Sequence, residues 1–292
     1  MYDTIIIGAG PAGLTAALYL ARANKKVLIL EAKAYGGQII KANKVENYPG
    51  VKEISGYDLA TIMYEQVKAL NVEIKYEIAK KITKNKEVYT NDNIYKAKSI
   101  ILATGCENRR LNLPNEINYI GKGLSYCATC DGAFYKNKIV AVIGGGASAV
   151  NDALYLSNIC NKVYLIHRNE TFKVDINNKS ENIEIILNST VVSINGDNLI
   201  ESIDIKDKDN NIKNIKINGL FVAIGREPKN ELFADIIKLD EKGYISSSDG
   251  VHTNIDKIYV AGDTRVKDLR QLVTAVNDGA IAAVTAIKEM EK

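Results

Sequence analysis

The sequence predicts an α/β fold of two three-layer domains, the second inserted into the first. Two copies of one pattern support this prediction, and their glycine-rich turns start at Gly8 and Gly144. Each copy is an apolar strand, a glycine-rich turn, an apolar helix and a second strand, which is typical of Rossmann-like dinucleotide-binding domains. The chain of 292 residues is long enough for two domains. We expect residues 1–107 and 228–292 to form the first domain and residues 108–227 the insertion.

The composition excludes several classes of partner. The 38 basic and 35 acidic residues are dispersed and leave a net charge of +3, which is too small for a nucleic-acid-binding surface. The first apolar run, Thr4 to Ile7, breaks at Gly8, so it is too short for a signal peptide or a membrane span. We therefore expect a cytoplasmic protein with no nucleic-acid or membrane partner.

The first copy of the pattern predicts a dinucleotide-binding site. A strand ends at Ile7, the turn runs through Gly8, Gly10 and Gly13, and a helix is expected from Leu14 to Ala23. Such glycines let the backbone approach a pyrophosphate, whose charge the helix N-terminus stabilises. The next strand, Lys26 to Leu30, ends at Glu31, where an acid can accept a hydrogen bond from a ribose hydroxyl and repels a 2′-phosphate. This unit suits a dinucleotide without a 2′-phosphate, such as FAD.

Further elements complete the expected first domain. Its helix is predicted over 57–70, and its strands over 72–76, 99–103 and 258–263. An amphipathic helix then runs to Met290. Two interpretations are equally good: its N-terminus faces a cofactor carbonyl, or Asp263 caps a turn and the helix only closes the core. A passage at 221–228 marks the return from the insertion.

A closely spaced cysteine pair precedes the second copy. Two residues separate Cys127 from Cys130, a spacing in which a disulfide closes easily and one thiolate becomes available for exchange. The adjacent Asp131 can carry the proton. Structural disulfides are rare in reducing compartments, so this pair is interpreted as catalytic. Cys106 and Cys160 are interpreted as packing residues. No metal site is expected, because structural zinc needs four ligands and both histidines are far away in sequence.

The second copy resembles the first but ends differently. Its strand is expected over 139–143, its helix reaches Ser157, and its second strand, over 162–166, leads into His167 and Arg168. A basic strand end suits NADP, although a tight turn without any ligand explains the glycines equally well. The connection from Arg168 to Asn182 lacks helical spacing and is barely long enough for a parallel return to 183–187. We therefore expect the outer edge of a second nucleotide pocket to be shortened, because the helix that usually borders it is missing.

With these motifs assembled, nearly the whole chain resembles the low-molecular-weight flavin thioredoxin reductases. The motifs that carry the resemblance are residues 8–13, 36–38, 46–50, 103–105, 126–132, 261–263 and 270–271. The resemblance implies FAD as cofactor, thioredoxin as partner and a homodimer. It also implies that Cys130 faces the flavin, that Cys127 attacks the thioredoxin disulfide and that Asp131 is the acid/base. The residues implied to bind FAD are Gly8, Gly10, Pro11, Ala12, Gly13, Glu31, Gly36, Gly37, Gln38, Asn47, Ala103, Thr104, Gly105, Gly262, Asp263, Arg270 and Gln271.

The chain departs from that family at the pyridine nucleotide. NADPH-dependent members usually have an acid where Ala147 stands, and two arginines after the histidine with a third four residues later; here Arg168 is followed by Asn169, with Lys173 farther along. A branch that is similar in lacking these motifs takes electrons from reduced ferredoxin. We therefore predict electron flow from ferredoxin through FAD and the cysteine pair to thioredoxin. Three alternatives stay open: NADPH bound at a weakened 2′-phosphate site, another donor such as reduced F420 or a flavin carrier, and a flavin-bound redox sensor.

Overall fold

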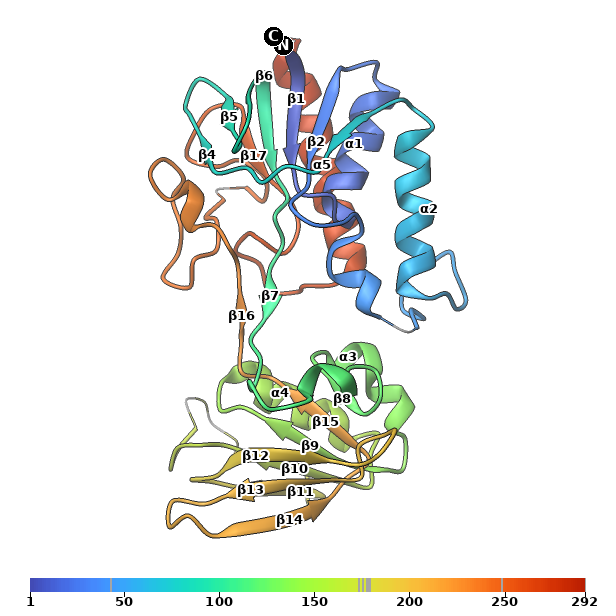
Figure 1. The fold of residues 1–292 in the computed structure, drawn as a ribbon, viewed down its shortest axis with the longest axis vertical. Helices are drawn as coiled ribbons and strands as arrows, with labels where there is room; N and C mark the ends of the chain where they lie inside the picture. Colours follow the sequence, from blue (N-terminus) through green and yellow to red (C-terminus); the bar gives the residue numbers. More distant parts are fainter. Residues whose placement is uncertain (43, 173, 175, 177–179, 248, 292) are drawn as a thin grey trace. The chain divides into compact units, whose positions relative to one another are not determined.

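The computed structural model describes residues 1–42, 44–172, 174, 176, 180–247 and 249–291, which form two compact units (Figure 1). Unit 1 contains Met1–Glu107 and Glu227–Lys292, and unit 2 contains Asn108–Arg226. The second unit is thus inserted into the first, as the predicted fold class requires. The chain crosses between them at β7 (Glu107–Asn108) and β16 (Arg226–Glu227), which pair with each other. Within the described residues, no helix is both long and apolar enough to span a bilayer.

A mainly parallel sheet organises unit 1. Its strand order is β3-β2-β1-β6-β5-β4, with β17 paired to β6. The central strands pair in parallel and the β4–β5 hairpin extends one edge in antiparallel fashion. The elements are β1 (Tyr2–Ile7), α1 (Pro11–Arg22), β2 (Val27–Leu30), α2 (Gly56–Lys68), β3 (Glu73–Lys75), β4 (Lys81–Ile82), β5 (Glu87–Tyr89), β6 (Ile94–Leu102), β17 (Ile258–Val260) and α5 (Leu272–Met290), with 3-10 turns at Gly37–Lys41 and Glu231–Phe233.

Neighbouring side chains along each strand of unit 1 point to opposite faces of the sheet, and each face is covered by a further layer. Ile6, Ile29 and Ile101 belong to the core under the helices, where α1 and α5 lie side by side (Figure 1). Their neighbours Ile5 and Leu28 belong to the opposite core, which is closed by the β4–β5 hairpin and the turn at Glu231–Phe233. The sheet is therefore buried on both faces, as its continuous apolar strands predict.

The helix after the first glycine turn begins earlier than the sequence analysis predicted. It starts at Pro11, not at Leu14, and ends at Arg22. A proline suits the first helical position because its missing N–H would lack an intrahelical acceptor there anyway. Gly10 is the extended N-cap. The last three residues of the glycine motif thus form the first turn of the helix.

Unit 2 has the same layered plan with different coverings. Its parallel sheet has the order β11-β10-β9-β15-β8; α4 packs on one face, and the antiparallel sheet β12-β13-β14 packs on the other. The elements are β8 (Leu124–Ser125), α3 (Ala128–Asp131), β9 (Ile139–Ile143), α4 (Ala147–Ser157), β10 (Lys162–Ile166), β11 (Ile183–Ile186), β12 (Thr190–Asn195), β13 (Ser202–Lys206), β14 (Ile212–Lys216) and β15 (Gly219–Val222), with 3-10 turns at Glu116–Tyr119 and Gly132–Tyr135.

The short connection from β10 to β11 makes the predicted parallel return. Val163 pairs with Ile183, and Ile166 pairs with Ile186. The described residues between 167 and 182 form no helix. Lys173 and residues 177–179 of the sequence analysis lie outside the described residues.

Candidate functional site

The paired cysteines of unit 2 form a disulfide between Cys127 and Cys130. Cys127 is the N-cap of the single-turn helix α3, and its carbonyl accepts hydrogen bonds from the amides of Cys130 (3.2 Å) and Asp131 (3.1 Å). Cys130 is exposed and Cys127 is partly exposed, so the bond is open to thiol exchange within this unit. Cys106 and Cys160 are buried and lie outside the disulfide, and burial raises the pKa of Cys160 to about 11. At neutral pH Cys160 is therefore a packing group and not a nucleophile.

A short hydrogen bond fixes the acid beside this disulfide. The Ser125 hydroxyl donates to Asp131 Oδ2 at 2.6 Å, and the amide of Cys127 donates to the same hydroxyl at 3.0 Å. Burial raises the pKa of Asp131, and the hydrogen bond from Ser125 opposes that rise without cancelling it. The side chain therefore holds a proton more readily than an ordinary aspartate, as an acid for thiolate leaving groups requires.

A buried carboxylate anchors the segment that leads into the cysteines. Glu116 is 2% exposed and accepts from the amides of Leu111 (3.0 Å) and Asn112 (2.8 Å) and from the Tyr126 hydroxyl (2.7 Å). Burial, followed by this hydrogen bond, raises the pKa of Tyr126 above its ordinary value. Tyr126, the residue immediately before Cys127, is thus held in place by the hydrogen bond from its hydroxyl to Glu116. Sequence reasoning missed this anchor.

The first glycine turn is shaped for close backbone approach. A Cβ on Gly8 would overlap the Ala103 carbonyl, and one on Gly13 would overlap the Gly8 carbonyl. Only glycine therefore lets β1, β6 and α1 meet here. The Glu31 carboxylate at the end of β2 accepts from the amides of Ala9 (2.7 Å) and Lys33 (2.9 Å), which holds it beside the turn. The turn, the helix N-terminus and the acid form the arrangement that a dinucleotide needs.

Three other predicted residues of unit 1, Gly36, Gly37 and Gly262, lie against this turn. The Gly36 amide donates to the Ala9 carbonyl at 2.8 Å. A Cβ on Gly37 would lie 3.2 Å from the Gly10 Cα, and one on Gly262 would lie 2.8 Å from the Ala12 Cβ. The side-chain amide of Asn47 donates to Gln271 Oε1 at 3.3 Å. Gln38 Oε1 accepts a hydrogen bond from the Lys41 ammonium at 2.9 Å. Gly105, after the end of β6, has a positive φ of 66°.

A buried polar network fixes the end of β6. Thr104 Oγ1 lies 3.0 Å from Asn230 Oδ1 and 2.7 Å from Thr264 Oγ1, and the Thr264 hydroxyl also donates to Asn230 (2.7 Å). Asn230 and Thr264 are both 0% exposed. The passage at 103–105 is thereby tied to the residue after Asp263. Sequence reasoning identified Thr104 but neither of its partners.

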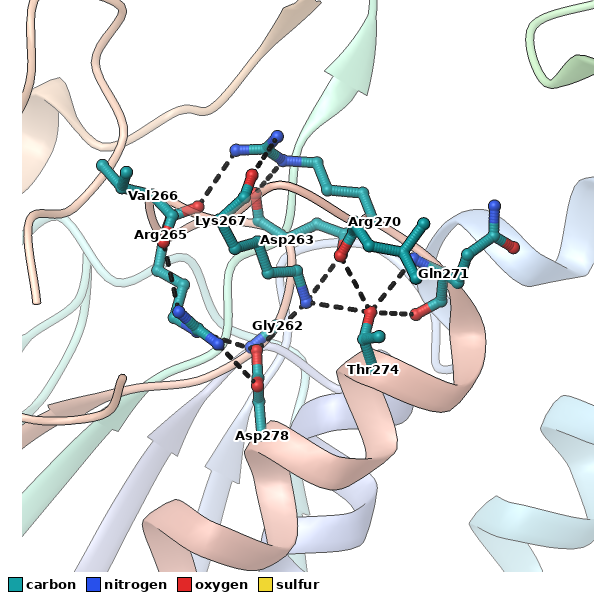
Figure 2. Close-up of polar contacts among 10 residues, drawn as sticks. Gly262, Asp263, Arg265, Val266, Lys267, Arg270, Gln271, Thr274 and Asp278 are labelled. Atoms are coloured by element: carbon teal, nitrogen blue, oxygen red, sulfur yellow. Dashed lines mark hydrogen bonds and ion pairs between the residues drawn. The ribbon is translucent and has the colours of Figure 1, made fainter. Parts of the chain in front are cut away.

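A buried aspartate organises the segment between β17 and α5 (Figure 2). Asp278, which is 2% exposed, accepts from the Gly262 amide (3.0 Å), from Arg265 Nε and Nη2 (both 2.9 Å) and from Lys267 Nζ (3.0 Å). Burial alone would raise the pKa of Asp278, but the hydrogen bonds and charges of Arg265 and Lys267 lower it overall. Lys267 Nζ also lies 3.3 Å from Asp263 Oδ1. The Gly262–Asp263 turn is thus fastened to α5.

The last residues before α5 are held by the segment itself and by Tyr244. The Arg270 guanidinium donates to the carbonyls of Asp263, Arg265 and Lys267 (Figure 2). It also lies 4.1 Å from the centre of the Tyr244 ring. Gln271 is the N-cap and forms a capping box with Thr274. The positive end of the α5 dipole is therefore fixed in place beside Asp263.

The second glycine turn is filled from its own unit. A Cβ on Gly145 would overlap the His167 imidazole, so that ring lies directly against the turn. His167 is 7% exposed and stacks on Phe172, with ring centroids 5.2 Å apart. His167 occupies the position that corresponds to Glu31 in the first copy, but here the ring is buried. On α4, burial raises the pKa of Asp152 to about 6, against the opposing charge of Arg226.

Among the described residues, no group of three or more His, Cys, Asp or Glu side chains is placed to hold a metal ion.

Comparison with known proteins shows which proteins the chain is similar to. The pyridine nucleotide-disulphide oxidoreductase family matches residues 2–279. The thioredoxin reductase of Treponema pallidum is 41% identical over 295 residues, covering 98% of this chain and 96% of that protein. The structure of thioredoxin reductase from Streptococcus pyogenes is 40% identical, with a TM-score of 0.94 and coverage of 100% of this chain and 98% of that one. A ferredoxin-flavin thioredoxin reductase from Clostridium acetobutylicum is 30% identical, with a TM-score of 0.55 and coverage of 99% and 98%.

Proposed function

The chain belongs to the pyridine nucleotide-disulphide oxidoreductase family and is a thioredoxin reductase of the low-molecular-weight flavin type, and we propose that its electron donor is reduced ferredoxin. The observation that carries the donor proposal is the end of β10, where Asn169 follows Arg168 in place of the second arginine that is usual in NADPH-dependent members, and where the described residues between 167 and 182 form no helix. The ferredoxin-flavin enzyme of Clostridium acetobutylicum, similar over 99% of this chain, adds support.

FAD is the cofactor of this family, and we propose that unit 1 holds it while unit 2 carries the dithiol. The close approach at Gly8 and Gly13 fits a pyrophosphate at the start of α1, and Glu31 lies where a ribose hydroxyl would be bound. The fixed N-terminus of α5 suits an anionic or carbonyl group of the cofactor. The remaining proposed contacts are Gly10, Pro11, Ala12, Gly36, Gly37, Gln38, Asn47, Ala103, Thr104, Gly105, Gly262, Asp263, Arg270 and Gln271.

The dithiol chemistry then follows from unit 2. When bound and reduced by the donor, the flavin would supply the electron pair that opens the Cys127–Cys130 disulfide, leaving one thiolate and, with a proton, one thiol. The Cys127 thiolate attacks one sulfur of the thioredoxin disulfide and forms a mixed disulfide, while the other thioredoxin sulfur leaves as a thiolate. Asp131 gives that thiolate a proton. The Cys130 thiol then gives its proton to the Asp131 carboxylate and attacks the Cys127 sulfur. The remaining thioredoxin sulfur leaves as a thiolate, which restores the internal disulfide and releases reduced thioredoxin.

NADPH is the weaker donor because its 2′-phosphate finds few cations. Of the cations that the family usually places after the histidine, Arg168 and Lys173 remain in the sequence, and Asn169 replaces an arginine. Each lost charge-assisted contact to a phosphate costs about 1.5 to 3 kcal/mol, or roughly one to two powers of ten in affinity.

The exposed face of α5 supports a homodimer as part of the proposal. Val273, Ile281 and Val284 are 43%, 44% and 37% exposed, and they share one side of the helix. Apolar side chains gathered on a single exposed face are typical of a surface covered by a partner. Sedimentation equilibrium of the wild type and of Ile281→Glu tests this: the wild type should sediment as a dimer and the variant as a monomer.

Anaerobic stopped-flow mixing tests the donor. Reduced ferredoxin should bleach the flavin absorbance rapidly, whereas micromolar NADPH or NADH should not. Asn169→Arg provides a matched gain-of-function variant, and it should lower the NADPH concentration needed for half-maximal bleaching by about tenfold or more. Rapid bleaching of the wild type by micromolar NADPH would show that the donor assignment is wrong while leaving the thioredoxin reductase activity intact.

A further inference from the structure

One buried hydroxyl connects the acid of the site to the backbone of a reactive cysteine. Ser125 lies on β8 and is 4% exposed. Its Oγ is 2.6 Å from Asp131 Oδ2, it accepts from the Cys127 amide at 3.0 Å, and it lies 3.3 Å from the Cys127 carbonyl oxygen. These contacts all lie within unit 2, and the dithiol chemistry described above assigns Ser125 no part.

We propose that Ser125 is a positioning residue for thiol exchange, whose hydroxyl orients Asp131 and sets the pH range over which Asp131 delivers its proton. The proposal rests on the role of Asp131 as the acid that protonates the departing thioredoxin thiolate. In that step the Asp131 O–H bond breaks, an S–H bond forms on thioredoxin, and Asp131 is left as a carboxylate.

The hydroxyl can serve Asp131 in both protonation states. A serine hydroxyl has one hydrogen and two lone pairs. When Asp131 is a carboxylate, the hydrogen points to Oδ2 and one lone pair accepts from the Cys127 amide. When Oδ2 carries a proton, Asp131 can donate to the second lone pair, and the serine hydrogen can turn to the Cys127 carbonyl. The proton is therefore exchanged without leaving a buried polar group unsatisfied.

Few other groups compete for control of Asp131. Apart from the cysteine pair, the described titratable group that interacts with Asp131 is Tyr135, and next to it lies Cys160. Burial raises the pKa of Tyr135 to about 12 and that of Cys160 to about 11, so both are neutral under working conditions. Burial favours the protonated Asp131, and the Ser125 hydroxyl favours the carboxylate.

The direction of the expected effect follows from this balance. Proton delivery needs the protonated acid, so its rate is full below the pKa of Asp131 and falls as the pH rises through it. Removing the hydroxyl removes the contact that lowers this pKa. We call the fall of this rate at high pH the alkaline limb. Ser125→Ala should move the alkaline limb to higher pH, by on the order of one pH unit for a hydrogen bond to a charged group.

Single-turnover reduction of thioredoxin by the pre-reduced holoenzyme, measured across pH, tests the proposal. Ser125→Ala should shift the alkaline limb upward, and Ser125→Thr should return it to the wild-type position. Ser193→Ala is the matched control, because Ser193 donates to Asp204 at the same 2.6 Å within the β12–β13 sheet, and it should shift nothing. Asp131→Asn should abolish the limb.

The outcomes separate the two roles. If Asp131→Asn abolishes the limb while Ser125→Ala leaves it in place, the role of Ser125 is overturned and that of Asp131 stands. If Asp131→Asn leaves the limb intact, the acid role fails, and the present proposal fails with it. Should Ser125→Ala not fold, infrared titration of the Asp131 carboxyl in the wild type and in Ser125→Thr decides, with an upward displacement in Ser125→Thr counting against the proposal.

Discussion

Replacing the buried Asp278 by asparagine keeps its shape and removes its charge. The variant leaves the ammonium of Lys267 (side chain 6% exposed) and the guanidinium of Arg265 (17% exposed) without their shared anion. Breaking a buried ion pair from one side costs about 3–5 kcal/mol. Asp263 still lies 3.3 Å from Lys267 and Arg265 keeps some access to water, so we expect a loss of about 2–4 kcal/mol.

Urea unfolding of the holoenzyme at a fixed FAD concentration measures this loss, with flavin fluorescence reporting release and circular dichroism reporting unfolding. The folded-state pKa of Asp278 is lowered, so its contribution is present above the pKa of an unfolded aspartate and is lost as the pH falls through the folded value. The difference between wild type and Asp278→Asn should therefore shrink in acid. Asp268→Asn, on the exposed part of the same segment, should change stability by less than about 0.5 kcal/mol. A loss below about 0.5 kcal/mol for Asp278→Asn at neutral pH, or one that grows in acid, would refute the reasoning.

Three further outcomes follow from the site. Gly13→Ala should yield protein that binds no FAD, because the new Cβ overlaps the Gly8 carbonyl; Gly146→Ala, whose Cβ meets open space, should retain FAD, and equal flavin content in the two would contradict this. Asp152→Asn should raise the free energy of unfolding by about 1–3 kcal/mol at neutral pH. Since burial raises the pKa of Asp152 to about 6, this gain should vanish below the pKa of an unfolded aspartate, and a gain that persists there would be inconsistent. Cys130→Ser should trap thioredoxin as a mixed disulfide on Cys127, seen as a band lost on reduction, and its absence would argue against Cys127 as the attacking thiol.

Strong local patterns were enough to predict the framework. The strand over 139–143 and the helix end at Ser157 agree with the observed bounds, because apolar periodicity and glycine turns mark them directly. The start of α1 was wrong by three residues, since the glycine motif extends into the first helical turn. The parallel return to β11 was also predicted, from the length of its connection.

The side-chain networks around the sites were not predictable in the same way. Ser125 contacts Asp131 because α3 turns back on β8, and no periodic pattern encodes that contact. Asp278 did carry a signal: it lies on the buried face of α5 beside Ala275 and Gly279, where an acid needs a cationic partner. Its partners lie in the irregular segment before the helix, so only the structure identifies them.

The central claim is that the cysteine pair accepts electrons from the bound flavin, and anaerobic reductive titration of the holoenzyme tests it most directly. A flavin and a disulfide each take up one electron pair. We predict that the wild type consumes twice as many electrons per flavin as the Cys127→Ser/Cys130→Ser double variant before absorbance stops changing. Equal uptake by the two proteins would contradict the account.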